Sequence, residues 1–494
     1  MRAEAASAPH RLFLGCDPNV LCDGRGRIVA VGPSARTAAP TDANVVELEG
    51  RALPGFGDAH IHLDELVLLR VGLDLRPTSS LQEVLASVRH AARSGGPDDW
   101  IVGRGWNYSS WPEPKLPTRH DLDQAAGGRP VLLASKDEHS IWVSSRALLL
   151  AGINEATADP PGGLIDREVG GQPSGIVREA WQLFGSFLPR PRPAEYQQLL
   201  LGVLNDLAQL GLCTVHTMDP AETLFSLQQL RGADRLPLRV VVNLPLSNLD
   251  AAKQVGIRSG WGDARLRVWG IKAFLDGSLG SRTAEMLDGS GVARIPELEE
   301  LIDRCLAAEL NLCLHAIGDG AVHRAMLALE RHPSVWRGWR PRIEHAQCVD
   351  PGDIPRFLQT GAVASMQPIH VVADREIADV EWGQTAKNAY AWARLAEAGV
   401  PLAFGSDAPV ESADPLLGLD AATAWRSRAG WYPELALTEE RAIEAYTAGV
   451  AFAAGMEAEC GRLAPGYRCD LTVVRDGQVV ATVVDGSVIY RRAS

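Results

Sequence analysis

The sequence predicts an α/β fold: a (β/α)8 TIM barrel with an inserted α/β subdomain and a small β-sandwich built from both termini. From about residue 196 onward, short apolar runs alternate with patterns typical of amphipathic helices. Eight such runs can be counted, and eight parallel strands close a barrel. Short alternating segments with hairpin turns occur only near the two ends of the chain, which favours a separate β-domain.

The eight expected barrel strands are short apolar runs. They lie in the segments RALPGFGDAHIH, CTVHTM, LRVVVNL, LRVWGIKAF, NLCLHAI, PRIEHAQ, AVASMQP and VPLAFGSDAP. Between them, segments such as ELEELIDRCLAAEL have apolar residues at intervals of three and four, as helices do. Alternating helices and buried strands indicate a parallel sheet. We therefore assign residues 53–460 to the barrel.

The stretch from about residue 65 to 190 separates the first two barrel strands and is too long for one connection. It contains strand-like segments, WIVGRGW and RPVLLAS, and loops rich in Trp and Pro. We expect an inserted subdomain over one mouth of the barrel. In it, Trp106 and Trp111 belong either to the core or to an apolar wall facing the substrate.

Residues 1–52 and 461–494 are expected to form the composite β-sandwich domain. Both segments hold short alternating runs, such as GRIVAVG and DLTVVRDGQVVATVVDGSVIYRR. The pairs Asp476-Gly477 and Asp485-Gly486 predict tight hairpin turns. Strands of this type at both ends of the chain, and none between, indicate that the two ends assemble together.

The composition limits the classes of partner. The chain of 494 residues has 48 Lys and Arg against 61 Asp and Glu, a net charge of −13, which disfavours nucleic acid and anionic lipid. Its eight cysteines include no C-x-x-C pair and are interpreted as buried reduced thiols. No signal-like or membrane-spanning apolar run is present. We therefore predict a cytoplasmic protein.

Polar side chains close five of the expected strands, where a core position would be apolar. The candidate metal ligands are His60, His62, Lys272, His315, His345 and Asp407. His60 and His62 are two residues apart, so their side chains lie on the same side of a strand. The carboxyl ends of barrel strands open onto one face, where barrel enzymes have their active sites. The alternative is six separate buried polar residues, each with a partner of its own.

The ligand types favour Zn²⁺ in one or two copies, with Mn²⁺, Fe²⁺ or Co²⁺ as alternatives. Lys272 cannot bind a cation while it is protonated. Beside a dication it can lose its proton and add CO₂, and the resulting carbamate can bridge two metals about 3.5–4 Å apart. The alternative for Lys272 is a buried ion pair with Asp276 or Asp407.

These motifs, PGFGDAHIHL, GIKAFLDGSLGSRTA, LHAIGDGAV, RIEHAQ and FGSDAPV, resemble the metal-dependent amidohydrolase superfamily. They are most similar to amidohydrolase family 3, which includes N-substituted formamide deformylase. The resemblance implies that His60, His62 and Asp407 hold one metal. It also implies that carbamylated Lys272 bridges to a second metal held by His315 and His345. The chain departs from the family pattern with DEH at residues 137–139, where DGH is common, and with Cys469 in the β-domain.

The predicted function is metal-dependent hydrolysis of a C–N bond in an amide, formamide or cyclic amide by a metal-activated hydroxide. The predicted catalytic residues are Asp407, His345 and Lys272, with Asp407 as general acid and base. The substrate is a small amide-type molecule. Candidate substrate-binding residues are His139, His216, Asp276 and Arg282, of which the last two could instead fix their loop. His370 is expected near the mouth of the barrel.

Two alternatives stay open. One is a deaminase of the same superfamily that acts on an aminated heterocycle, although such enzymes generally lack the lysine of the fourth strand. The other is a catalytically silent homologue that binds metal. The sequence does not identify the physiological substrate, and a homodimer is expected only because many relatives form one.

Overall fold

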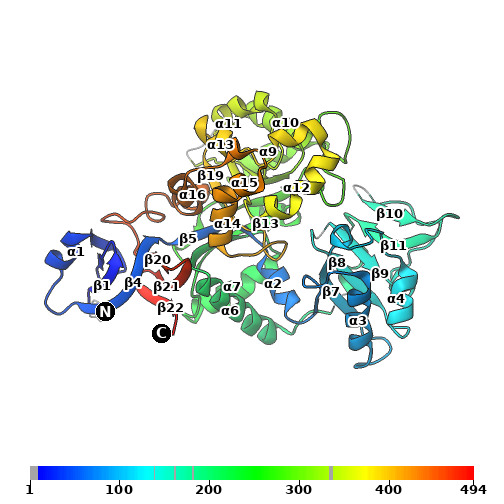
Figure 1. Cartoon of the computed structure of the whole chain (residues 1–494), viewed down its shortest axis with the longest axis horizontal. Coiled ribbons are helices and arrows are strands. Elements are labelled where there is room, and N and C mark those ends of the chain that lie inside the picture. Colours follow the sequence, from blue (N-terminus) through cyan, green and yellow to red (C-terminus); the bar gives the residue numbers. More distant parts are fainter. Residues whose placement is uncertain are drawn as a thin grey trace.

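The structure, a computed structural model, describes residues 9–493 except 138, 161–162, 181–182, 188 and 333–337. At its centre is a sheet of parallel strands nearly closed into a barrel (Figure 1). Its strands are β5 (Phe56–Ile61), β12 (Leu212–Thr217), β13 (Arg239–Pro245), β15 (Leu266–Phe274), β16 (Asn311–Ala316), β17 (Arg342–His345), β18 (Val363–Met366) and β19 (Leu402–Phe404). The predicted barrel is confirmed, and a short strand, β14 (Trp261–Gly262), adds an antiparallel partner to β15.

The barrel strands are buried along most of their length, which explains why they are continuous apolar runs in the sequence. Strands that are neighbours in the barrel follow one another along the chain. Their register aligns the carboxyl ends, where the polar residues lie. Phe274 of β15 lies opposite His315 of β16, and Ala316 lies opposite His345 of β17. The register therefore brings residues that are far apart in sequence to one end of the barrel.

The first and last strands meet just beyond the end of β19. The Asp407 amide donates to the carbonyl of His60 at 2.7 Å, and the His62 amide donates to the carbonyl of Ala408 at 2.9 Å. Asp58 strengthens this junction, because its Oδ1 accepts from the amides of His60 and Ser406 at 3.0 and 3.1 Å. This junction places the His60–His62 segment beside Asp407.

Helices surround the barrel on the outside (Figure 1). Those between strands include α6 (Pro193–Gln209), α7 (Ala221–Gly232), α8 (Leu249–Gln254), α9 (Leu298–Ala307), α10 (Asp319–Glu330), α11 (Ile354–Thr360), α12 (His370–Glu381) and α13 (Trp392–Glu397). After β19 come α14 (Pro415–Ala422), α15 (Ala424–Ala429), α16 (Glu439–Tyr446) and α17 (Ala448–Ala453). In α9 the buried face consists of Leu298, Leu301, Ile302 and Cys305, at the three- and four-residue spacing expected of an amphipathic helix.

Strands from both termini form one seven-stranded sheet, at the opposite end of the molecule from the insertion (Figure 1). Its order is β22-β21-β20-β4-β1-β2-β3. The strands are β1 (Arg11–Asp17), β2 (Val20–Cys22), β3 (Ile28–Val31), β4 (Asn44–Pro54), β20 (Leu471–Arg475), β21 (Gln478–Val484) and β22 (Ser487–Arg491), with α1 (Pro33–Ala38) after β3. Asp476-Gly477 and Asp485-Gly486 have positive φ at both positions, as two-residue hairpin turns require.

The long strand β4 joins the two ends of the chain, because it pairs with β1 on one side and with β20 on the other. This sheet fits the expected sandwich domain. A buried ion pair fastens it to the barrel: Arg239 of β13 lies 2.9 Å from Asp470. All eight cysteines are buried and free of disulfides.

The insertion contains a six-stranded sheet in the order β10-β11-β9-β8-β7-β6. Its strands are β6 (Leu73–Asp74), β7 (Ile101–Trp106), β8 (Val131–Ser135), β9 (Ser140–Val143), β10 (Leu164–Arg167) and β11 (Pro173–Arg178), and its helices are α3 (Leu81–Ala92), α4 (Arg119–Ala125) and α5 (Ser145–Leu150). Helix α2 (Leu63–Leu69) leads into it from β5. Trp106 and Trp111 both belong to its hydrophobic core. Within the described residues, no helix is both long and apolar enough to span a membrane.

Candidate metal centre

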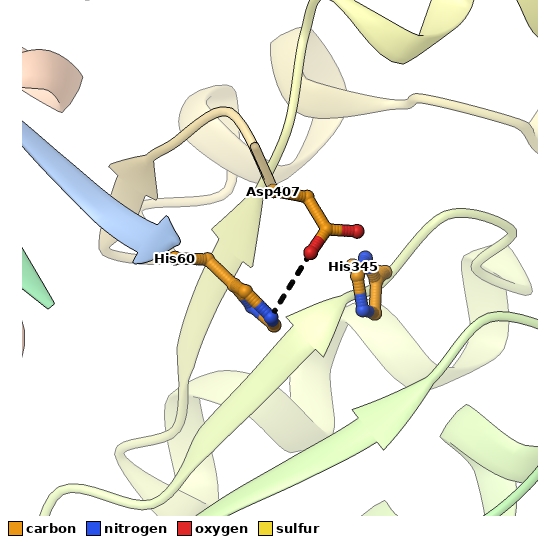
Figure 2. Close-up of side chains that lie close together, drawn as sticks. All are labelled: His60, His345 and Asp407. Carbon is orange, nitrogen blue, oxygen red and sulfur yellow. Dashed lines mark ion pairs between the residues drawn. The ribbon is translucent and has the colours of Figure 1, made fainter. Parts of the chain in front are cut away.

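Three side chains meet at the carboxyl end of the barrel: His60 from β5, His345 from β17, and Asp407 beyond β19 (Figure 2). Each offers one nitrogen or oxygen atom, and these atoms all lie within 4.8 Å of one another. Nε2 of His60 is 3.4 Å from Oδ1 of Asp407. All three residues are buried, so the group has the spacing and the composition of a metal-ligand cluster.

The other three predicted ligands extend this cluster. Nε2 of His62 lies 3.1 Å from Oδ1 of Asp407, and Nζ of Lys272 lies 3.3 Å from Nε2 of His60. The His315 ring is 4.5 Å from the His345 ring, measured between centroids. The structure therefore brings all six predicted ligands together, although they come from five strands.

The backbone is strained at two of these positions. His345 has a φ of 73° and Asp407 a φ of 60°, in the left-handed region that residues other than glycine rarely adopt. Such conformations cost on the order of 1–3 kcal/mol and cluster at functional sites. Here His345 ends β17 and Asp407 follows β19 by three residues, so both strained positions lie at the end of the barrel where the cluster forms.

The unpaired atoms of the cluster fit a bound cation. Nδ1 of His345 is buried without a hydrogen-bond partner among the described residues, and Oδ1 of Asp407 faces Nε2 of His60 at 3.4 Å and Nε2 of His62 at 3.1 Å. Leaving such atoms unpaired is costly, so native structures usually satisfy them with a partner or an ion. His315 is also suitably oriented, because its Nε2 donates to the carbonyl of Gly277 at 2.9 Å and leaves Nδ1 for a metal.

Electrostatics keep most of the imidazoles neutral, as metal ligation requires. Burial holds the pKa of His60 well below its usual value. Burial likewise lowers the pKa values of His315 and His345. Asp407 is ionised: burial raises its pKa, but His60 and His62 outweigh that effect and lower it overall.

Lys272 lacks the ion pair that was its alternative interpretation. Within the part of the chain that the structure describes, no carboxylate lies within 4.0 Å of Nζ, and the amine sits 4.9 Å from the centre of the Phe274 ring. Burial lowers the pKa of Lys272, which favours the neutral amine. A neutral buried amine is the form that can react with CO₂.

A buried ionic network lies behind His60, and sequence reasoning missed it. Oε2 of Glu344 is 2.8 Å from Nδ1 of His60, and both side chains are fully buried. Arg342 donates to Oε2 of Glu344 at 3.0 Å and to Nδ1 of His216 at 2.9 Å. Arg342 and Glu344 are two residues apart in a buried strand, and that spacing of opposite charges was the available signal.

The cluster opens into a cavity of about 840 Å³ between the barrel and the insertion. The barrel side includes Phe274, Leu279 and Ile317, and the insertion side includes Trp106 and Tyr108. Trp106 thus belongs both to the core of the insertion and to the cavity wall, whereas Trp111 does not line the cavity.

The predicted substrate-binding residues separate into two groups. His139 lines the cavity, and His370 does so as well. His216 is fully buried inside the barrel and does not line it. Arg282 is 60% exposed and pairs with Glu381 at 3.0 Å, away from the cavity wall.

Asp276 also lies off the cavity wall and fixes its loop, as one of the two interpretations of the sequence expected. It is fully buried and accepts from the amides of Glu285, Ile317 and Gly318 at 2.9 to 3.1 Å. Burial raises its pKa to about 7. The departure from the family pattern at residue 138 lies outside the described residues.

Comparisons with known proteins agree with this geometry. Residues 44–490 match the model of the amidohydrolase family. The chain is 29% identical to the YtcJ amidohydrolase of Bacillus subtilis (strain 168), over 91% of this chain and 90% of that protein. It is 28% identical to the N-substituted formamide deformylase of Arthrobacter pascens, over 97% of this chain and 95% of that enzyme.

A solved structure shares the whole architecture. An uncharacterized metal-dependent hydrolase from Pyrococcus furiosus superposes with a TM-score of 0.72 at 27% identity, covering 95% of this chain and 99% of that one. The barrel, the cluster at its carboxyl end and the match along nearly the full length lead to one conclusion. This chain belongs to the amidohydrolase family and is a metal-dependent hydrolase.

Proposed function

We propose that this protein hydrolyses a C–N bond of a small uncharged amide, with an N-substituted formamide or a related N-acyl amine as the substrate class. The observation that carries the proposal is the convergence of six ligand-type side chains on the wall of one cavity. The similarity to an N-substituted formamide deformylase supports the choice of bond.

The charge balance of the cavity supports an uncharged substrate. Apart from Lys272, each lysine and arginine on the described wall is already paired with a carboxylate: Arg104 with Glu65, Lys136 with Glu411, Arg178 with Asp166, Arg190 with Asp64 and Arg294 with Glu179. Each of these five side chains therefore already has a carboxylate partner, which weakens its attraction for a substrate carboxylate or phosphate. The apolar wall formed by Trp106, Tyr108 and Phe274 suits a hydrophobic substituent on the nitrogen.

His60, His62 and Asp407 would hold one divalent cation, and His315 and His345 a second, with Lys272 as a bridging carbamate. Nitrogen and carboxylate ligands of this kind favour Zn²⁺, with Mn²⁺, Fe²⁺ or Co²⁺ as alternatives. When bound, such a cation lowers the pKa of water toward about 7 and polarises a carbonyl group.

Asp407 then serves as the general base and acid. Its Oδ1 faces the His60 and His62 imidazoles, so Oδ2 is the oxygen available to take a proton. Because Asp407 is ionised, it accepts the proton of the attacking water at Oδ2 and passes it to the leaving nitrogen. Nε2 of His370, 3.8 Å from Oδ2, limits where that carboxylate can swing.

A deaminase acting on an aminated heterocycle is the second candidate. The buried Lys272 disfavours it, because the lysine has no ion-pair role among the described residues and a single-metal site would not need it. A catalytically silent metal-binding protein is the third candidate, and the strained backbone at His345 and Asp407 argues against it. A cytoplasmic location and a homodimer stay predictions from the sequence.

The test combines metal analysis with a substrate screen. Protein purified without chelator is analysed for its metals and assayed on N-substituted formamides, N-acyl amines, cyclic amides, esters and aminated heterocycles. We expect amide cleavage that is lost on chelation and restored by Zn²⁺. Ammonia release from the heterocycles alone would favour the deaminase, and bound metal without any turnover would favour the silent homologue.

A further inference from the structure

The insertion contributes a histidine to the cavity, and the barrel holds it in place. His139 lies in the turn between β8 and β9, and its ring is 5.3 Å from the ring of His315, measured between centroids. Its Nδ1 lies 3.0 and 2.9 Å from the two carboxylate oxygens of Glu179. Nε2 has no hydrogen-bond partner among the described residues and is not enclosed by protein, so it is left for a ligand in the cavity.

Glu179 is built into the boundary between the insertion and the barrel. It follows β11, its side chain is only 5% exposed, and its amide donates to the carbonyl of His139 at 2.9 Å. From the loop after β15, Thr283 donates to Oε1 at 2.8 Å and Arg294 forms an ion pair with the carboxylate. This loop follows the strand that carries Lys272, so Glu179 connects His139 to the metal centre.

Two backbone features show that the arrangement is tightly determined. Glu179 has a φ of 56°, which a non-glycine residue adopts only at a cost. Gly277 leaves space for the carboxylate, because a Cβ at that position would lie 2.4 Å from Oε1 of Glu179 and 1.8 Å from Oγ1 of Thr283. The carbonyl of Gly277 also orients His315. One glycine therefore serves both the metal cluster and the His139–Glu179 pair.

We propose that His139 is a catalytic residue supplied by the insertion, whose Nε2 hydrogen-bonds the substrate beside His315, and that Glu179 is its positioning residue. The proposal rests on the hydrolase function proposed above and adds a contact from outside the barrel. From this position Nε2 of His139 is placed to hydrogen-bond one of the two polar atoms of an amide substrate, the carbonyl oxygen or the leaving nitrogen.

The test uses the metal-loaded full-length enzyme and whichever member of the screen it turns over fastest. His139→Ala should lower kcat/KM on the order of 10²-fold, mainly through kcat, with unchanged metal content. His139→Gln, which keeps a donor near the position of Nε2, should recover part of the loss. Glu179→Gln should cost on the order of 10-fold alone and nothing further in the His139→Ala background, because it acts through His139.

A matched control is available on the outside of the barrel. His323 of α10 pairs with Asp353 through the same type of contact, with Nδ1 2.9 Å from a carboxylate oxygen, but it does not line the cavity. His323→Ala should leave kcat/KM unchanged. A His139→Ala variant within twofold of wild type would overturn the proposal, and so would an equal effect of Glu179→Gln with and without His139.

A binding measurement separates this proposal from the proposed function. A phosphonamidate, which has the tetrahedral shape of attacked amide, is titrated calorimetrically into wild type and His139→Ala. Weaker binding to the variant, by a factor similar to its loss of kcat/KM, supports the contact; equal binding overturns it. If the fastest substrate proves to be an ester or a heterocycle, the proposed C–N hydrolysis fails, whereas the role of His139 is still decided by the same variants.

Discussion

Nδ1 of His60 lies 2.8 Å from Oε2 of Glu344, and both side chains are fully buried. A carboxylate can only accept, so Nδ1 carries the proton and Nε2 is left with its lone pair toward Asp407 and Lys272. Arg342 compensates the buried charge of Glu344. The pair thus fixes the tautomer and the orientation of the imidazole before any metal binds.

Glu344→Gln should therefore weaken metal binding. Loss of such a supporting carboxylate typically costs 10- to 100-fold in affinity. The measurement is competition for Zn²⁺ against a chromophoric chelator, with the unfolding temperature recorded in parallel. Glu444→Gln, which removes an exposed carboxylate 3.8 Å from Arg462, is the control and should bind metal as wild type does. Unchanged affinity in Glu344→Gln would show that Arg342 and the barrel position His60 without it.

Lys272→Ala should reduce the metal content by one ion per chain and lower the activity at least 10²-fold, because the bridging group is lost. Elemental analysis and turnover on the best amide measure these effects. Native mass spectrometry gives an independent readout, since wild type should carry the added mass of one CO₂ and Lys272→Arg should not. A full metal content in Lys272→Ala would contradict the bridging role.

Asp407→Asn should lower kcat by roughly 10²- to 10⁴-fold, the range typical of a lost general acid–base group. The fold should persist, because the amide occupies the same volume. Steady-state kinetics and circular dichroism check the two halves of this prediction. Asp420→Asn, which disrupts only a surface pair with Arg428, should be indistinguishable from wild type. A retained rate in Asp407→Asn would remove Asp407 from the mechanism.

The His139–Glu179 pair should make stability depend on pH. Glu179 outweighs burial and raises the pKa of His139 from 6.5 to about 9, so its contribution is present below pH 6.5 and is lost as pH rises through 9. The pKa of Glu179 is lowered from 4.5 to about 2: burial opposes the shift, and His139 drives it. That contribution is present above pH 4.5 and is lost as pH falls through 2.

The pair is thus most stabilising between about pH 4.5 and 6.5. A His139→Gln/Glu179→Gln double variant should unfold a few °C below wild type at pH 5.5 and approach it near pH 9.5. Differential scanning calorimetry at both pH values measures the difference in unfolding temperature. A difference that does not change with pH would mean that the two side chains are not ionised in the folded protein.

Several features of the structure could be predicted from patterns within short stretches of the sequence. The barrel strands were recognisable because strands buried on both faces must be apolar throughout, and the hairpins at Asp476-Gly477 and Asp485-Gly486 because few residues tolerate positive φ. His60 and His62 were recognisable as a pair because alternate residues of a strand share one side. The six candidate ligand positions were predicted because ionisable residues seldom end a buried strand without a reason.

Other features depended on contacts between distant segments. The sequence left open whether Arg282 binds substrate or fixes its loop, and in the structure it pairs with Glu381 on α12 and does not line the cavity. His216 lies near the end of a strand just as His315 does, but its Nδ1 accepts a hydrogen bond from Arg342 inside the barrel. The role of Glu179 could not be predicted from the sequence, because its partners Thr283 and Arg294 are more than a hundred residues away in the chain.

The sequence by itself determined the barrel, the terminal sheet and the positions of the candidate metal ligands, because periodicity and turn chemistry act over a few residues. Tertiary structure alone decided which nitrogen of each imidazole is available, which polar residues reach the cavity, and how the insertion takes part in the site. Those properties arise from hydrogen bonds and charges that meet only when remote strands and loops pack together, so no local pattern of residues encodes them.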